Sequence, residues 1–277
     1  MPLHPATQPN RNSHLTCLTK MLVFALAFTA FSSVRWVCED RRKQEEKRVA
    51  EKVAHSKVLL VLPHLFKMFW FASIVAYEWQ TLATMPWLPS FLGGAGEDSL
   101  FEEGPAEELA YFYEIQLAYH THSMLFSYLI GSKMEMHLHH LVTIVLIVLS
   151  NVLGYRRSGA VVFTLHDTPD IVGCGIKAAV IAEDVIVTLV FYVALLVVWG
   201  MFRLYFLPML IIDIIHSSIP QADRVVFSLL LAVLVMLHYF WYFQFLLMAY
   251  KFRKTGKTRD ISEKTPHPAD LAHPKRS

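Results

Sequence analysis

Histidines and carboxylates gather in parts of the sequence that are otherwise apolar. His139 and His140 stand near the start of one apolar stretch, and His166, Asp167 and Asp170 lie within the next. Ionisable groups inside a bilayer are costly and usually serve a function. An imidazole titrates near neutral pH, so it can take a proton from an amine or attack an activated acyl group, and a carboxylate can orient it. This combination is suited to acyl transfer.

The spacing of the two aspartates indicates how they could act. Asp167 and Asp170 are three positions apart, so on a helix they share a face and can point into one cavity or toward one partner. In an alternative interpretation, Asp167 or Thr168 caps a helix that restarts at Pro169, and Asp170 lies in its first turn. Capping does not explain the adjacent His166. The paired histidines also have a structural alternative, as buried hydrogen-bonding groups at the end of a span.

Metal binding is the main competing chemistry for a histidine-rich membrane protein. Membrane desaturases and hydroxylases bind iron with groups such as HxxxH and HxxHH, whereas this chain has H-x-H-H at His137–His140 and H-x-H at His120–His122. It also lacks the HExxH of zinc proteases. We therefore expect no metal site and no cofactor. The cysteines are too few and too scattered for a disulfide framework or a CxxC site: Cys17, Cys38 and Cys174.

The elements that hold these groups must be membrane helices. Of 277 residues, 55% are hydrophobic and only 17% are charged, and the net charge of +2 gives nucleic-acid binding little support. Several uncharged apolar runs approach the roughly 20 residues that cross a bilayer. We predict an all-α, polytopic integral membrane bundle of about seven transmembrane helices. The predicted spans are residues 18–37, 58–80, 110–131, 138–155, 159–182, 185–210 and 225–250.

The placement of charge predicts the orientation in the membrane. Eight Lys or Arg lie between Arg35 and Lys57, whereas none lies in residues 68–132, so the first basic block should face the cytosol. Seven spans then place the N-terminus in the lumen and the C-terminus, with basic residues at 251–259, in the cytosol. Arg156 and Arg157 oppose this rule, which suggests that at least one serves another purpose.

The chain divides into three parts by composition. Residues 1–57 contain the first span and a basic cytosolic linker, residues 58–252 contain the remaining spans, and residues 253–277 form a polar tail that we expect to be disordered. The first span is expected to be an anchor, although its short apolar core also resembles a cleaved signal peptide. Residues 82–109, with six carboxylates and no cation, are expected to form an irregular loop on the lumenal side.

A continuous motif resembles the signature of ceramide synthases, the acyl-transferring branch of the TLC-domain membrane proteins. It is similar to the family's HHxxT, its serine, its arginine and glycine, and its HDxSD followed by a lysine. Flanking matches extend the resemblance over about residues 58–252. The matching positions are Tyr111–Leu117, Ser123–Phe126, His139, His140, Thr143, Ser150, Arg157, Gly159, His166, Asp167, Asp170, Lys177, Arg203, Tyr205, Pro208, Leu237, His238 and Trp241.

The resemblance implies an enzyme of the endoplasmic reticulum membrane that transfers a fatty acyl group from acyl-CoA to the amine of a sphingoid base. His139 would be the acyl acceptor or the general base, and His140 its supporting partner. Asp167 and Asp170 would orient these groups or bind the amine. The implied partners are acyl-CoA as co-substrate, the sphingoid base and membrane lipids, with a homo- or hetero-oligomer left open. We expect four further residues to bind substrate: His166, Arg157, Arg203 and His238.

The chain departs from the family pattern inside the signature. Cys174 stands where the family has an acid between Asp170 and Lys177, and Asn151 and Gly154 replace an aromatic residue and an asparagine. These departures leave a second function open, that of a TLC-domain protein that binds lipids or regulates the membrane without acyl transfer. Retention of both histidines and both aspartates favours catalysis. A third alternative is an acyltransferase with a different amphiphilic acceptor.

Overall fold

The structure of the protein is a computed structural model, and it describes residues 11–51, 56–95, 100–101 and 109–255. No strand occurs among these residues, and the predicted all-α class is confirmed. The elements are α1 (Arg11–Ala50), α2 (Lys57–Leu82), η1 (Ser90–Leu92), α3 (Ala110–Leu129), α4 (Met134–Val152), α5 (Arg156–Ala182), α6 (Val185–Trp199), η3 (Gly200–Phe206), α7 (Leu207–His216) and α8 (Gln221–Thr255).

Each predicted span corresponds to a helical rod, because α6, η3 and α7 follow one another without a break. Five of the rods are long and apolar enough to cross a membrane: Thr19–Val49, Lys57–Leu82, Met134–Val152, Val185–His216 and Gln221–Lys254. The other two, α3 and α5, are long enough but carry the histidines and charged side chains that reduce their hydropathy. The described part of the chain is thus a polytopic bundle of apolar helices.

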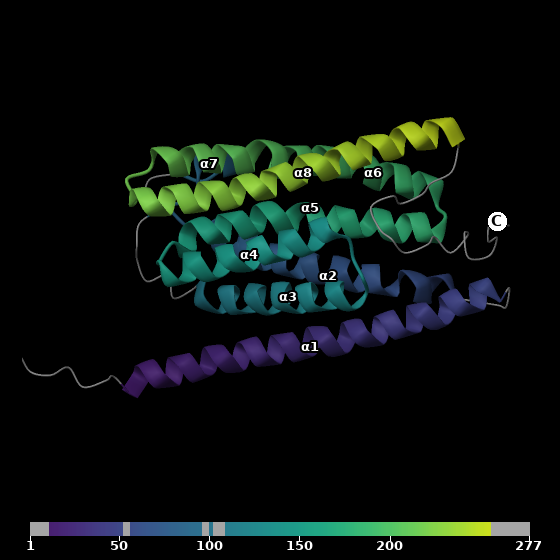
Figure 1. The fold of residues 1–277 in the computed structure, drawn as a ribbon, viewed down its shortest axis with the longest axis horizontal. Coiled ribbons are helices and arrows are strands. Elements are labelled where there is room, and N and C mark those ends of the chain that lie inside the picture. The colour runs from purple at the N-terminus through teal and green to yellow at the C-terminus, as the bar shows by residue number, and fades with distance from the viewer. Residues whose placement is uncertain (1–10, 52–55, 96–99, 102–108, 256–277) are drawn as a thin grey trace, which may run out of the picture.

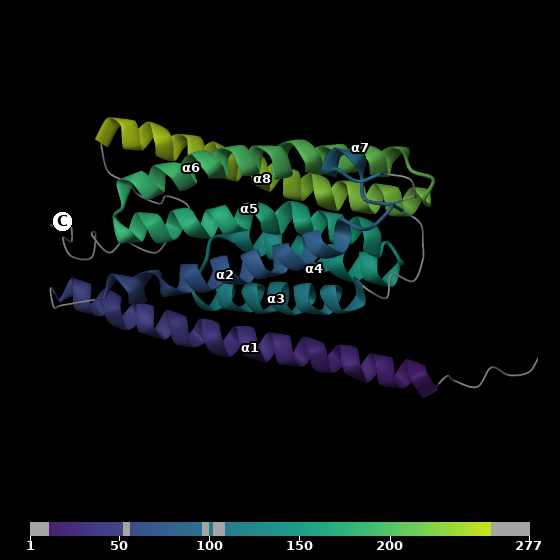
Figure 2. The same ribbon diagram turned by 180° about the vertical axis from the view of Figure 1, so that it is seen from behind.

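The helices run along a common direction (Figure 1), and α5 lies at the centre of the bundle. In both views α1 forms one side and the rods of α6, α7 and α8 form the other (Figures 1 and 2). α1 packs against α2 and α3, whereas α5 contacts α2, α4, α6 and η3. A central helix is shielded by its neighbours on several sides, which explains how α5 can bury polar residues.

One end of the bundle carries many basic residues. α1, α3, α5 and α8 end where α2, α4 and α6 begin, and Figure 1 shows these termini on its right. Exposed basic side chains of α1 lie at this end, among them Arg41, Lys43 and Lys47. This is the end that the positive-inside rule assigns to the cytosol.

Some sequence predictions fall on residues outside this description. Residues 256–277 are outside it, so only Arg253–Thr255 of the predicted tail are described, and they continue α8. The predicted acidic loop is described only in part, and the short helix η1 lies within it. α5 continues through Pro169, so the interpretation in which a helix restarts at this proline is wrong.

Candidate functional site

A cavity of about 300 Å³ lies in the basic half of the bundle and is lined by residues from α1 to α6, η3 and α8. His139 and His140 of α4 line it together with Asp170 of α5 and Arg203 of η3. The structure therefore brings both signature histidines and one signature aspartate to a single chamber. His120 of α3, which the sequence analysis placed only in a weak histidine motif, lines the same chamber.

Each of the two signature histidines has one ring nitrogen that forms no hydrogen bond within the described residues. The Nδ1 atoms of His139 and His140 are buried, and within the described residues neither has a hydrogen-bond partner. The two ring centroids are 5.3 Å apart, and the ring of His139 lies edge-on to Trp241 of α8 at 5.5 Å. The interpretation of these histidines as groups satisfied by internal hydrogen bonds therefore does not describe their Nδ1 atoms.

His166 and His238 form a pair behind His139. Their Nε2 atoms are 3.0 Å apart, and the Nδ1 atom of His166 lies 2.7 Å from the carbonyl oxygen of Val162. Because a carbonyl only accepts, Nδ1 of His166 must donate, and in the neutral pair its Nε2 accepts from His238. Both rings lie about 6 Å from His139, at 6.2 and 6.0 Å between centroids. Neither is among the cavity-lining residues.

The two signature aspartates have different partners. Asp170 accepts a hydrogen bond of 2.7 Å from Nη2 of Arg203, and it lines the cavity. Asp167 is buried away from the cavity and accepts from the side-chain amide of Gln116 in α3. The same amide nitrogen donates to the buried Glu78 of α2 at 3.1 Å. A common helix face therefore does not give Asp167 and Asp170 a common partner or a common cavity.

Arg203 lies in the seven-residue π-helical segment η3 and connects three groups. Besides Asp170, its guanidinium donates to the backbone oxygen of His166 and stacks over the ring of Trp199 at 4.0 Å. Turns of π-helix are rare in proteins overall, but those that occur are often at functional sites. The wider turn changes the direction of the side chains that follow. The guanidinium is thereby held at the wall of the chamber.

Arg157 is the predicted site residue that lies farthest along the chain from the chamber, at the other end of α5. It lies in the first turn of α5, at the opposite end from Lys177, and its guanidinium is 5.8 Å from the ring centroid of Trp87. The neighbouring Arg156 donates to the side chain of Asn151 at 2.7 Å. These contacts give the two arginines at the start of α5 local roles.

Glu78 and Gln116 are two buried polar residues to which the sequence analysis assigned no role. The signal for Glu78 is present in the sequence, since it is the one charged residue between Met68 and Leu82. An isolated acid in an apolar span points to a partner on another helix. The identity of that partner depends on the packing of α2 against α3 and α5.

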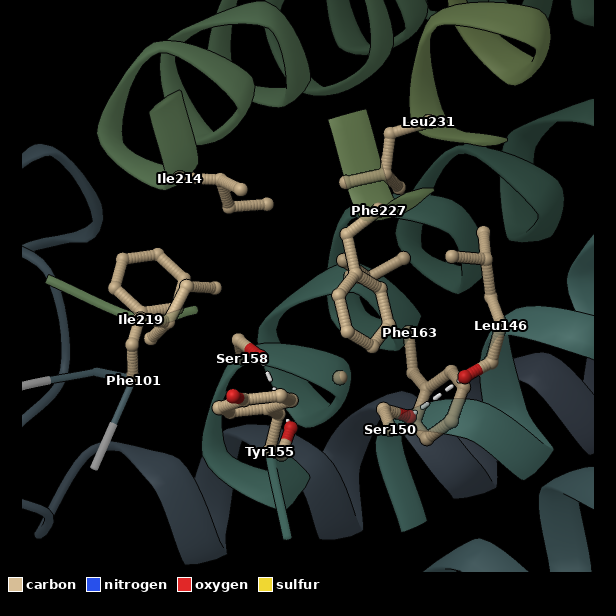
Figure 3. A pocket seen from close by; sticks show the side chains of 12 residues that line it. Phe101, Leu146, Ser150, Tyr155, Ser158, Phe163, Ile214, Ile219, Phe227 and Leu231 are labelled. Atoms are coloured by element: carbon tan, nitrogen blue, oxygen red, sulfur yellow. Dashed lines mark hydrogen bonds between the residues drawn. The ribbon is translucent and has the colours of Figure 1, made fainter. Parts of the chain in front are cut away.

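A second cavity lies near the other end of the bundle (Figure 3). Its walls are largely aromatic and aliphatic, with Phe101, Tyr155, Ile214 and Phe227 around the space. Its volume of about 30 Å³ leaves room for no more than a water molecule or two. It is therefore too small for a long-chain substrate. Across the described residues, no three His, Cys, Asp or Glu side chains form a group that could hold a metal ion.

Comparison with known proteins gives two findings. The family model described as the TLC domain matches residues 60–247, which include every residue of the histidine chamber except those supplied by α1 and the end of α8. The chain is similar to ASC1-like protein 3 of Oryza sativa subsp. japonica, with 22% identity over 223 residues that cover 74% of this chain and 76% of the relative.

Proposed function

The chain belongs to the TLC-domain family, and we propose that it is a ceramide synthase that transfers a fatty acyl group from acyl-CoA to the amine of a sphingoid base. The observation that carries the proposal is that His139, His140 and Asp170 line one chamber. A neutral imidazole at the wall of a cavity can take the proton of an amine, and both imidazoles line this cavity.

The shape of the chamber supports an amphiphilic substrate. One wall comes from α6 and α8 and is apolar, including Leu195, Trp199 and Phe245. The opposite wall comes from α1, α2 and α3 and carries Arg35 and Lys67. Acyl-CoA and a sphingoid base both join a long chain to a polar or charged head. Each could therefore place its chain on the first wall and its head toward the second.

In the proposed reaction the neutral amine nitrogen of the sphingoid base attacks the carbonyl carbon of the thioester. One imidazole takes the proton that the nitrogen loses, the new C–N bond forms and the C–S bond breaks. The proton then goes to the departing thiolate, which gives an amide and CoA. A route in which His139 first accepts the acyl group has the same overall balance, with the imidazole nitrogen as the first nucleophile. His140 is the partner that takes the proton in this second route.

Asp170 and Arg203 fit the positioning part of this proposal. Their ion pair places a carboxylate at the chamber wall, where it can hold the ammonium form of the amine before deprotonation. Asp167, His166 and His238 lie one layer behind, and we assign them to positioning of the groups in front. We further propose that the protein resides in the endoplasmic reticulum membrane with the basic end of the bundle in the cytosol, where acyl-CoA is met.

The proposal is tested by mass-spectrometric assay of the purified protein with a panel of acyl-CoAs and sphingoid bases. We expect N-acyl sphingoid base from the parent, and a loss of at least about a hundredfold in His139→Ala, as for removal of a general acid or base. Asp167→Ala should lose activity as well. His137→Ala is the matched control, because His137 shares α4 but does not line the cavity. Full activity of both site variants at equal expression would disprove the mechanism.

A second candidate function is lipid binding without acyl transfer. The observation that favours it is Cys174, which lines the chamber at the position where the ceramide synthase signature has an acid. A thiol is a weak hydrogen-bond former, so the chamber could retain a lipid with less hold on an amine. Lipid that co-purifies with the protein, without product from any acyl-CoA and base pair, would support this alternative.

A further inference from the structure

Two carboxyl groups and one amide meet where α2, α3 and α5 pack together behind the chamber. The Nε2 atom of Gln116 donates to Asp167 and to Glu78, at 3.1 Å to the latter. A primary amide has two N–H groups, so both are used by these acids. Glu78 and Gln116 are each 1% exposed, and Asp167 is 2% exposed. Bulk water is therefore kept away from both carboxyl groups.

Two ionised carboxylates at this place would have no counter-ion of their own. Both accept from one nitrogen atom, and like charges that are so close in a buried site do not both ionise. In the part of the chain that the structure describes, neither Glu78 nor Asp167 forms an ion pair with a lysine or an arginine. The charged groups that act on Asp167 include Asp170 and Arg203, which are paired with each other. One of the two acids must therefore hold a proton.

The hydrogen bonds around Glu78 place this proton on its carboxyl group. As a carboxylate, Glu78 would have one buried oxygen, Oε2, that has no hydrogen-bond partner among the described residues. The hydroxyl of Thr164 lies beside Glu78 but donates to the carbonyl oxygen of Ala160, at 3.1 Å. As a carboxylic acid, Glu78 gains an O–H, and the side chain of Asp167 lies within hydrogen-bonding reach of it.

The position of Arg203 explains why the negative charge remains on Asp167. Its guanidinium donates to the backbone oxygen of His166, the residue before Asp167, and pairs with Asp170 three positions further on. The cation is thus held on α5 at the level of Asp167, whereas Glu78 belongs to α2. Attraction by this cation stabilises the charge of Asp167, on which it acts.

We infer that Glu78 is a further positioning residue of the site, and that it acts as a carboxylic acid whose O–H donates to the carboxylate of Asp167. The turn of α5 that brings Asp170 to the chamber is then held from two sides. Arg203 binds it from η3, and Glu78 with Gln116 binds it from α2 and α3. The inference rests on the proposed function only for the effect on the rate of acyl transfer.

Infrared spectroscopy of the full chain tests the protonation. The protein is placed in nanodiscs of an ether-linked phosphatidylcholine, which has no ester carbonyl, so that a protonated carboxylic acid is seen above the amide I band. At neutral pH we expect the parent to show a band that Glu78→Gln loses. This band should move to lower frequency when the glutamate carboxyl carbons carry the heavy stable isotope. Asp184→Asn is the matched control and should keep the band, because Asp184 is exposed and accepts from the backbone N–H of Val187.

Two replacements of Glu78 test the positioning role. Glu78→Gln retains an N–H donor toward Asp167 in a neutral side chain of similar size, whereas Glu78→Leu has no donor. We expect Glu78→Gln to melt near the temperature of the parent and Glu78→Leu to melt lower. In the acyl-transfer assay, kcat of Glu78→Leu should fall about tenfold or more through misplacement of Asp167. KM for acyl-CoA should not change, since Glu78 does not line the chamber. Glu78→Gln should retain most of the rate.

Several results would overturn the inference. One is a parent without the carboxylic acid band at neutral pH, and another is an undiminished band in Glu78→Gln. A band that moves with labelled aspartate instead of labelled glutamate would do the same, as would equal kcat in Glu78→Leu and Glu78→Gln. If Glu78→Gln does not fold, labelled Glu114→Gln takes its place, because it removes the half-buried glutamate of α3. A labelled glutamate band that remains supports the inference, and its absence overturns it.

The same measurements separate this inference from the proposed function. A Glu78-dependent band and the expected order of melting temperatures, in a protein that makes no ceramide, would retain the protonated Glu78 and refute the acyl transfer. Ceramide formation by a parent that lacks the band would retain the acyl transfer and refute the protonated Glu78.

Discussion

The Nε2 atoms of His166 and His238 lie 3.0 Å apart, although the two residues are separated by 72 positions in the sequence. This contact joins α5, at the centre of the bundle, to α8. His238 is fully buried, and its ring also lies 5.5 Å from Trp199 and 5.7 Å from Trp241. The pair therefore holds His238 in its packing against the two tryptophans behind His139. It also gives the hydrogen bond between the two histidines a defined direction.

His238→Leu should lower the stability of the protein. The leucine removes the hydrogen bond to His166 and leaves a buried imidazole nitrogen without a partner, which costs about 1–3 kcal/mol. The matched control is His137→Leu, in which a partly buried histidine of α4 is replaced by the same residue. Thermal unfolding in detergent measures the difference. A melting temperature for His238→Leu equal to that of the control would show that the pair contributes little.

The ion pair between Arg203 and Asp170 predicts a strong effect from one-sided removal. The side chain of Arg203 is 3% exposed and that of Asp170 is 32% exposed, so Arg203→Leu leaves a partly shielded carboxylate without its cation. We expect a loss of about 2–3 kcal/mol, at or below the lower end for a broken buried pair because Asp170 retains some solvent. The double variant with Asp170→Leu should recover part of this loss. A double-mutant cycle of unfolding free energies tests the coupling, and additive losses would contradict it.

Replacement of Gln116 should affect stability differently, because its one amide group donates to two carboxyl groups. Gln116→Ala removes the donor to both Asp167 and Glu78 and should cost about 1–3 kcal/mol for each buried acceptor that loses its partner. Gln116→Glu should cost more, since it replaces the shared donor with a third acid. Thermal unfolding of the two variants gives the order. Greater stability of the glutamate variant would show that the amide does not connect these acids.

Two glycines of α5 form a matched pair for a packing test. A Cβ atom at Gly159 would lie 1.8 Å from the hydroxyl oxygen of Tyr113, whereas at Gly173 the nearest atom is a methyl carbon of Leu195 at 4.0 Å. Gly159→Ala should therefore destabilise the protein by about 1–3 kcal/mol through overpacking. Gly173→Ala should be neutral or slightly stabilising, because alanine favours a helix by up to about 1 kcal/mol. Equal unfolding free energies for the two variants would contradict the close approach of α3 to α5.

The sequence was sufficient to predict the membrane class and the rods, because both depend on local apolarity and length. It also located His139, His140 and Asp170, which the cavity brings together. The separate environments of Asp167 and Asp170 were not predictable. Residues three positions apart on a helix differ by about 60° in direction, which in a crowded bundle is enough for each to meet a different neighbour.

Two further features depend on tertiary structure rather than on local pattern. The π-helical turn that carries Arg203 has no signature in residues 200–206, since a wider turn is stabilised by its surroundings. Gln116 can contact two acids only because α2, α3 and α5 bring these three residues to the same level along the bundle. Sequence spacing within a helix contains no information about such a meeting.

The attachment of α1 along only one flank of the bundle has a consequence for shortened chains. α1 packs mainly against α2 and α3, so a chain that begins at Ser56 would keep the contacts of α5 with its neighbours and every histidine of the chamber. The lining would then lack Arg35, Glu39 and Arg42, and the chamber would be more open on the side that α1 covers. In such a fragment the remaining helices would still position the histidines, but the wall that α1 places around the ligand space would be missing.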